Sequence, residues 1–211
     1  MQNPVIIFGA KQLGITALDI FNSNEVVVYC FLDDDEKLHQ MEMNNITVMG
    51  DTEATEFLKL LGKTCDACVA TEDAATRRSI TEMLREDYKT IPVNAIHKFS
   101  YVSEQAWLGH GNLIAAGVVV GANAKVGDNC IIRPNAVIDA GAVVGNEVEI
   151  GAGAAINSDV TIEDGAFIGS GVTIVSGVKV GKNARIGAGS VVIADVAAKQ
   201  TVFGNPAQAV K

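Results

Sequence analysis

Asp139 and Glu149 are two of the three acidic residues in the stretch VIDAGAVVGNEVEIGAG, which runs from Val137 to Gly153 and contains no histidine, serine or cysteine. A carboxylate can act as a general base when it lies within hydrogen-bond reach of the group that loses a proton. Both residues also fit the description of ordinary outward-facing carboxylates. We take Asp139 and Glu149 as the catalytic candidates, and the elements that carry them decide what they can reach.

A second group of polar residues lies near the N-terminus, after two apolar runs. The run VIIFGA leads into a glycine-bounded loop that opens a helical pattern, and the amides of such a loop could hold a phosphate. The run EVVVYCFLDDD ends in three acids that could accept hydrogen bonds from a base or a ribose, although a solvated strand end has the same composition. The resulting candidates for substrate binding are Gly9, Ala10, Lys11, Gln12, Leu13, Gly14, Asp33, Asp34 and Asp35.

The cysteines and the net charge argue against several kinds of site. Each of the four cysteines sits in an apolar run, where a reduced, buried thiol is the ordinary state. The pair Cys65-Asp-Ala-Cys68 is better explained as part of a buried strand than as a metal or redox pair, because no second pair or histidine cluster follows it. We therefore expect no metal. A net charge of -9 argues against a nucleic-acid partner.

Length and composition set the broad class of the protein. With 211 residues, of which 48% are hydrophobic, the chain can form one or two compact domains. Its apolar runs are shorter than the ~18 residues of a membrane span, and Met1 to Pro4 lead directly into a strand-like run, so we expect a cytoplasmic protein. Residues 164–211 hold five basic side chains against two acidic ones, so a small polyanion could bind near the C-terminus.

From Val102 onward the sequence divides into sixteen consecutive hexapeptides. Position one is always Val, Leu or Ile, position four is Gly eight times, Asn four times and Asp twice, and position five is nearly always small. Gly, Asn and Asp tolerate the left-handed backbone of tight turns. A helix would repeat near 3.6 residues and a lone strand at about 2, so a period of six predicts short strands joined by turns, three to a coil. The expected fold of residues 98–211 is a parallel β-helix with position-one side chains stacked inward.

A β-helix with three strands to a coil is a triangular prism, and the position-six side chains of its hexapeptides point outward. One ladder consists of small and mostly apolar residues, namely Val119, Val137, Ala155, Thr173 and Val191. A monomer would expose this stripe, so we expect it to pack on another subunit, with a threefold assembly as the natural closure. The alternative is that the C-terminal tail covers it.

Residues 1–97 lack the six-residue period. The strand-like runs VIIFGA, EVVVYCFLDDD, CDACVAT and IPVNAI alternate with helical patterns at Ile15 to Phe21 and at ATRRSITEMLRED. This alternation predicts a small Rossmann-like α/β domain, with a parallel sheet and helices on its faces. Nucleotides bind at the carboxyl ends of the strands in such sheets.

Together these features resemble one family, the two-domain sugar O- or N-acyltransferases that include sialic-acid O-acetyltransferases and bacillosamine-type acetyltransferases acting on UDP-4-amino sugars. The matching stretches are FGAKQLG, CFLDDD, AIHKFSYVS, the hexapeptides and the closing VFGNPAQAVK. The resemblance implies a left-handed β-helix, a homotrimer, acetyl-CoA bound between neighbouring prisms and a nucleotide sugar held by the N-terminal domain. It also implies that the acetyl donor contacts Gly187, Ala188, Gly189, Gly204, Asn205 and Pro206.

The resemblance fails at the catalytic base. The histidine expected from the family falls on Ala140, its acidic neighbour on Gly141 and a second histidine on Glu149. The chain's own histidines lie in a polar loop, at the domain junction and in an early hexapeptide, and they are His39, His97 and His110. Since general-base assistance is worth about 100- to 10,000-fold and positioning of the reactants can contribute a similar or larger factor, loss of the histidine does not by itself exclude catalysis.

The missing histidine favours an amine over a hydroxyl as acceptor. A sugar amine can attack a thioester as the free base, whereas a hydroxyl needs a base much more. We therefore expect an acetyl-CoA-dependent N-acetyltransferase that acts on a nucleotide-linked amino sugar for surface glycan synthesis. The alternative is a catalytically silent trimer that binds a ligand or partner, or has a structural role. A zinc lyase on the same prism is disfavoured, because the hexapeptides contain one histidine, His110.

Overall fold

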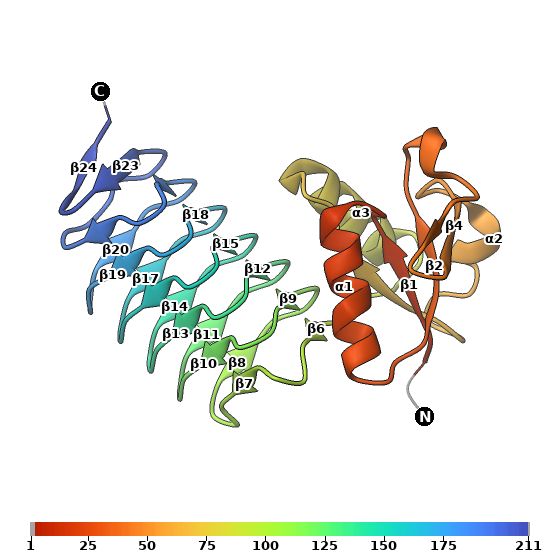
Figure 1. The fold of residues 1–211 in the computed structure, drawn as a ribbon, viewed down its shortest axis with the longest axis horizontal. Helices are drawn as coiled ribbons and strands as arrows, with labels where there is room; N and C mark the ends of the chain where they lie inside the picture. The colour runs from red at the N-terminus through yellow and green to blue at the C-terminus, as the bar shows by residue number, and fades with distance from the viewer. Residues whose placement is uncertain (1–2, 211) are drawn as a thin grey trace. The chain divides into compact units, whose positions relative to one another are not determined.

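The computed structural model describes residues 3–210, and the chain divides into two units after Lys98 (Figure 1). The first unit is an α/β domain and the second is a stack of short strands. None of the helices within residues 3–210 has both the length and the apolar character that a membrane crossing requires.

The first unit is built on a five-stranded sheet with the order β3-β4-β2-β1-β5. β1 pairs in parallel with β2 and β5, β2 pairs in parallel with β4, and β3 joins β4 in an antiparallel hairpin. The strands are β1 (Val5–Phe8), β2 (Val28–Leu32), β3 (Glu42–Met43), β4 (Ile46–Gly50) and β5 (Asp66–Val69). The helices are α1 (Gln12–Ser23), the 3-10 helix η1 (Glu36–Leu38), α2 (Thr55–Leu58) and α3 (Ala74–Glu86).

The strands of this sheet are apolar because both of its faces are covered. Every residue of β1 is buried, and Ile6 and Phe8 pack with Phe57 of α2 and Leu84 of α3. The predicted strand at CDACVAT is β5, and Cys65 just before it and Cys68 within it are both buried and not in disulfides. The run IPVNAI contributes only the two-residue strand β6 (Ala95–Ile96), which is not part of the five-stranded sheet.

The second unit is a parallel β-helix whose coils stack in Figure 1 from green to blue. Each hexapeptide contributes a two-residue strand, and strands eighteen residues apart pair in parallel, as Ile132 does with Ile150. One sheet contains β7 (Tyr101–Val102), β10 (Val119–Val120), β13 (Val137–Ile138), β16 (Ala155–Ile156), β19 (Thr173–Ile174) and β22 (Val191–Val192). A second contains β8 (Trp107–Leu108), β11 (Lys125–Val126), β14 (Val143–Val144), β17 (Thr161–Ile162) and β20 (Lys179–Val180).

The third sheet of the prism closes the triangle and carries the C-terminal hairpin. It contains β9 (Leu113–Ile114), β12 (Ile131–Ile132), β15 (Glu149–Ile150), β18 (Phe167–Ile168), β21 (Arg185–Ile186), β23 (Thr201–Gly204) and β24 (Ala207–Ala209). Its position-one ladder, Ile114, Ile132, Ile150, Ile168 and Ile186, is fully buried, as the six-residue period predicts.

The turns between the short strands have the left-handed backbone that was expected at position four of each hexapeptide. Fourteen of the sixteen position-four residues have a positive φ, including all eight glycines and all four asparagines. Glu147, which is neither Gly, Asn nor Asp, also adopts this left-handed conformation, with φ of 58°. The turn is therefore imposed by the stacking of the coils and does not depend on glycine at every corner.

Candidate functional site

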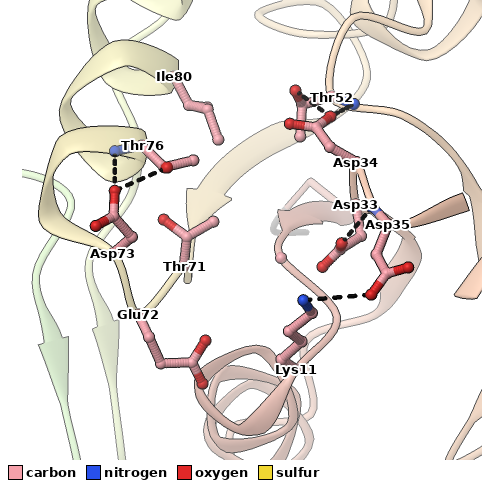
Figure 2. A pocket seen from close by; sticks show the side chains of 11 residues that line it. Lys11, Asp33, Asp34, Asp35, Thr52, Thr71, Glu72, Asp73, Thr76 and Ile80 are labelled. Atoms are coloured by element: carbon pink, nitrogen blue, oxygen red, sulfur yellow. Dashed lines mark hydrogen bonds and ion pairs between the residues drawn. The ribbon is translucent and has the colours of Figure 1, made fainter.

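A cavity of about 420 Å³ opens at the carboxyl ends of β1, β2 and β5 in the first unit (Figure 2). Its position agrees with the rule that ligands of parallel sheets bind beyond the carboxyl ends of the strands. The lining residues come from the loop after β1, the acids after β2, and the segment between β5 and α3. They are Gly9, Lys11, Asp33, Asp34, Asp35, Thr52, Thr71, Glu72, Asp73, Thr76 and Ile80.

The glycine-bounded loop after β1 forms a tight turn into α1. Gly9 has φ of 107°, and a Cβ atom at Gly14 would collide with the carbonyl group of Gly9, so neither position accepts a larger residue without strain. Of the six loop residues predicted to bind substrate, Gly9 and Lys11 line the cavity. Ala10 and Leu13 are buried, Gly14 is packed against Gly9, and Gln12 begins the helix.

The loop amides are already engaged by carboxylates. The amide of Ala10 donates to Asp33 Oδ2 at 2.7 Å, and the amide of Leu13 donates to Glu72 Oε1 at 2.9 Å. A carboxylate therefore occupies the amino end of α1, the place where a phosphate binds in many nucleotide-binding loops. The assignment of the loop as a phosphate site remains a prediction, and these contacts leave few free amides to support it.

The three acids after β2 have different surroundings. Asp33 is buried and uses both oxygens, accepting from the amides of Ala10 and Asp35. Asp34 Oδ1 accepts from both the amide and the hydroxyl of Thr52, at 2.9 and 2.8 Å. The amide of Lys37 and then the side chain of Lys11, whose ammonium lies 3.4 Å from Asp35 Oδ2, hold the pKa of Asp35 below its ordinary value.

Two further acids, Glu72 and Asp73, line the cavity and were missed by the sequence analysis. They follow β5 directly in the stretch ATEDAAT. Asp73 caps α3, because its Oδ2 accepts from the amide and hydroxyl of Thr76, and these bonds lower the pKa of Asp73. The signal was available, since polar residues that follow a buried parallel strand lie at the same sheet edge as Asp33 to Asp35.

In the second unit, Asp139 lies at the prism corner that follows β13. Its Oδ2 accepts from the hydroxyl of Ser158 at 2.7 Å, and its Oδ1 accepts from the amide of Ala140 at 2.7 Å. The Ser158 bond and then the Ala140 bond hold the pKa of Asp139 below its ordinary value. The side chain is therefore a fixed anion and a weak base, placed beside the alanine where a histidine was expected.

Glu149 lies on β15, in a different sheet of the prism from β13. Its Oε1 is held by Arg133, with Nη2 at 2.7 Å and Nε at 2.8 Å. The guanidinium competes for the electron pairs that a general base would use. Asp139 thus has both oxygens held by uncharged donors, whereas Glu149 has one oxygen held by a cation, and a catalytic role for either residue stays a prediction.

Two of the three histidines belong to the first unit and one belongs to the second. His39 follows η1, with its Nε2 atom 2.7 Å from the carbonyl oxygen of Asp33. His97 is buried, with its Nε2 atom 3.9 Å from Asp19 Oδ2. His110 is at another corner, where its amide donates to Asp128 Oδ1. Within the second unit, His110 follows β8 and Ala140 follows β13, so this histidine does not take the place of the missing side chain at Ala140.

The two segments predicted to contact the acetyl donor lie side by side. The amide of Gly187 donates to the carbonyl of Val202, which aligns the turn after β21 with β23. The hydroxyl of Ser190 then joins the segments, donating to the carbonyl of Gly187 at 2.7 Å and accepting from the amide of Gly204 at 3.1 Å. Ala188 and Gly189 complete the first segment, and Asn205 and Pro206 form the turn of the β23–β24 hairpin.

Part of the positive charge in the last coils is neutralised within the prism. Lys179 forms a 2.7 Å ion pair with Glu163, which lowers the pKa of Glu163, and Lys182 lies 3.7 Å from Asp164. Arg185 stacks over the ring of Phe167 at 4.6 Å. Lys211 lies outside the described residues. Arg185 and Lys199 are consequently the cations best able to meet an anionic donor.

The comparisons with known proteins agree with this geometry. The family model described as bacterial transferase hexapeptide (six repeats) matches residues 105–140, 123–158, 141–176 and 159–194. Among curated protein sequences no significant match is found. The crystal structure of PerB from Caulobacter crescentus in complex with CoA and GDP-perosamine is 27% identical, with a TM-score of 0.90, and the match covers 100% of this chain and 99% of that one.

A second solved structure extends the likeness. The acetyltransferase domain of PglB from Neisseria gonorrhoeae, in complex with acetyl coenzyme A, is 25% identical over 100% of both chains, with a TM-score of 0.89. Over both units the chain is similar to solved acetyltransferase structures, and residues 105–194 match the hexapeptide family model. Its repeats and parallel strands form a left-handed β-helix, as expected. WeeI from Acinetobacter baumannii, at 22% identity and a TM-score of 0.86, shares the fold.

Proposed function

We propose that the protein is an acetyl-CoA-dependent N-acetyltransferase that acts in the cytoplasm on a nucleotide-linked amino sugar. The observation that carries this proposal is the likeness to perosamine N-acetyltransferase, which extends over both units and is not confined to the common hexapeptide fold. That relative binds CoA and GDP-perosamine. The cavity in the first unit has the position and size to hold the nucleotide, and the last coils offer the expected donor segments.

The reaction needs little acid–base assistance when the acceptor is an amine. The amine nitrogen bonds to the thioester carbonyl carbon, the carbon–sulfur bond then breaks, and the sulfur leaves as CoA thiolate. The proton shed by the nitrogen finally reaches the thiolate, directly or through a carboxylate or water. A fixed anion such as Asp139 fits this sequence, since it can stabilise the positive charge on the attacking nitrogen without being a strong base.

We also propose a homotrimer, closed through the sheet that contains β13. Its outward ladder is continuous from Tyr101 to Val191 in the register of the strands, and the five residues after Tyr101 are small and mostly apolar. Val137 in the middle of this ladder is 37% exposed. Burial of such a stripe between subunits would remove apolar surface from water.

The second candidate function is a catalytically silent binding or structural protein of the same family. The replacement of the expected histidine by Ala140 favours it, together with the engagement of both candidate carboxylates in hydrogen bonds. Histidine-to-alanine and histidine-to-asparagine variants of perosamine N-acetyltransferase still bind CoA and GDP-perosamine. Binding of the donor alone therefore does not separate the two candidates, whereas transfer of an acetyl group does.

Binding of the acetyl donor is tested by calorimetric titration of the full chain with acetyl-CoA. We expect one binding site per subunit. Substitution of Arg185 by Gln, which removes a cation near the predicted donor segments, should weaken acetyl-CoA binding about threefold to tenfold. Glu82→Gln, a change on the exposed surface of α3, serves as the control. No detectable binding at millimolar acetyl-CoA would overturn the proposal.

A further inference from the structure

The inference concerns the base of the nucleotide and rests on the proposed function. Three of the five acids that line the cavity have structural tasks, because Asp33 binds two amides, Asp35 pairs with Lys11, and Asp73 caps α3. Asp34 and Glu72 differ. Each has one oxygen anchored, by Thr52 or by the amide of Leu13, and a second oxygen that makes no hydrogen bond or ion pair within residues 3–210.

The side chains of Asp34 and Glu72 line the cavity from opposite sides. Figure 2 shows Glu72 on the β5 side and Asp34 on the β2 side, with the cavity between them. The floor between them also holds an unsatisfied polar atom, because the hydroxyl oxygen of Thr71 is buried and has no hydrogen-bond partner among the described residues. A buried hydroxyl without a partner indicates a position that a bound polar group completes.

The two carboxylates can be assigned to different parts of a nucleoside. An acid at the end of the second strand of a dinucleotide-binding fold accepts hydrogen bonds from the ribose hydroxyls. Asp34 has that place at the end of β2. Glu72, at the end of β5 on the other side of the cavity, then faces the base. Since an ionised carboxylate is an acceptor only, the base must present donors to it.

We infer that the nucleotide is a guanosine diphosphate and that Glu72 selects it over the uridine equivalent. The Watson–Crick edge of guanine carries two adjacent donors, N1–H and the exocyclic amine. They match the free oxygen of Glu72 and the second lone pair of its anchored oxygen. Uracil offers a single N3–H between two carbonyl oxygens, so a carboxylate that accepts from it also faces a carbonyl. The Thr71 hydroxyl can donate to guanine O6, the acceptor beside N1–H.

Because one oxygen is anchored, the Glu72 side chain is already oriented for hydrogen bonding to the base before the nucleotide binds. The bond from the Leu13 amide fixes one oxygen and thereby orients the other, so little side-chain freedom is lost on binding. The same bond places a negative charge at the amino end of α1, which disfavours a diphosphate there. The base, and not the phosphates, therefore lies against the loop after β1.

The test is calorimetric titration of the full chain with GDP and with UDP, for the wild type and for Glu72→Gln, Asp34→Asn and the surface control Glu82→Gln. We expect GDP to bind at least about tenfold more tightly than UDP, since a hydrogen bond to a charged group is worth about 1.5 kcal/mol or more. Glu72→Gln keeps the oxygen that accepts from Leu13, so the fold is retained. It should weaken GDP binding roughly 10- to 100-fold and UDP binding by less than about threefold.

Each outcome has a distinct meaning. Asp34→Asn should weaken GDP and UDP by the same factor, because the ribose is common to both, and Glu82→Gln should change neither. Equal or tighter binding of UDP, or a Glu72→Gln variant that keeps its preference for GDP, would overturn the inference and leave the proposed function intact. Failure of both nucleotides to bind at millimolar concentration would instead contradict the nucleotide-sugar part of the proposed function.

Discussion

At the scale of single residues, the expected chemistry depends on which side chain replaces the histidine missing at position 140. Ala140 cannot take a proton, and the nearest candidate, Asp139, is held by Ser158 and by the Ala140 amide. Such an anion can stabilise charge on an attacking amine but is too weak a base to activate a hydroxyl. The chemistry expected of this corner is therefore transfer to nitrogen.

The first prediction concerns Asp139 itself. Asp139→Asn should lower kcat for acetyl transfer to an amino sugar about 10- to 100-fold, because the amide keeps the hydrogen bond to the Ala140 amide but loses the negative charge. Glu149→Gln, which loses only a carboxylate already paired with Arg133, should lower it by less than about threefold. Steady-state assays of both variants check this. Equal kcat values for the wild type and both variants would show that neither carboxylate takes part.

The second prediction concerns the ionisation of Asp139. Its pKa is held below the ordinary value of about 3.9, so the charged form stabilises the fold above that pH, and this contribution is lost as the pH falls through the folded-state pKa. Ser158→Ala removes the largest cause and should raise the pKa. Carbon-detected NMR titration of the Asp139 carboxyl group measures it.

Ser176→Ala is the matched control for the titration. Ser176 occupies the same position of the following coil, where no hydrogen bond to Asp139 is present. It should leave the Asp139 titration unchanged. An Asp139 carboxyl group that titrates at its ordinary value in the wild type would contradict the hydrogen-bonded geometry.

The residues that line the cavity of the first unit were only partly predictable from the sequence. The acids after β2 were identifiable because they end an apolar run in a cluster of three. Glu72 was passed over, since acidic residues just before a helix, as in Glu72-Asp73, are common at helix starts. Its importance depends on the contact with the Leu13 amide, fifty-nine residues away in sequence, and a single sequence contains no signal for that pairing.

At the scale of elements, the hexapeptide period determines almost everything about the second unit. Position one gives the inward ladder, position four gives the turn, and the strand pairing eighteen residues apart follows from three strands to a coil. The role of the glycines at position two required the structure. A Cβ atom at Gly151, for example, would collide with the backbone amide of Ser170 in the next coil.

A pair of glycine variants tests this distinction between positions two and four. Gly153→Ala meets no neighbouring atom within 4 Å, so it should cost only the strain of its positive φ, about 1 kcal/mol of unfolding free energy. Gly151→Ala pushes against the backbone of the next coil and should cost at least about 3 kcal/mol. Denaturant unfolding measures both. Equal losses at the two positions would contradict the stacking argument.

The elements of the first unit were less completely predictable. The apolar runs of β1, β2 and β5 and the helical pattern of α3 were recognisable, because each is long enough to show its period. The β3–β4 hairpin was missed, since β3 is two residues long and has an exposed and a half-buried side chain. Its place in the sheet comes from pairing with β4 and not from a local pattern.

At the scale of the whole molecule, the proposed assembly depends on the sheet that contains β13. Val137→Lys places a charge in the middle of the apolar ladder and should convert the trimer to monomers. Val143→Lys is the matched control, because Val143 is equally exposed, at 39% against 37%, but lies on the sheet that already carries Lys125 and Lys179.

Light scattering coupled to size-exclusion chromatography measures the mass of both variants. We expect a trimeric mass for the wild type and for Val143→Lys, and a monomeric mass for Val137→Lys. A monomeric mass for the wild type would contradict the proposed homotrimer. A trimer that survives Val137→Lys would place the subunit interface on another face of the prism.

The central claim is that this protein transfers an acetyl group to an amine, and the most direct measurement is product analysis by mass spectrometry. The purified chain would be incubated with acetyl-CoA and a GDP-linked amino sugar, and in parallel with the sugar that carries a hydroxyl group at the same position. We predict one acetyl group added to the amino sugar, with release of one CoA thiol, and none added to the hydroxyl sugar. No acetylated product from GDP- or UDP-linked amino sugars at millimolar acetyl-CoA would contradict the account and identify a binding protein that has lost catalysis.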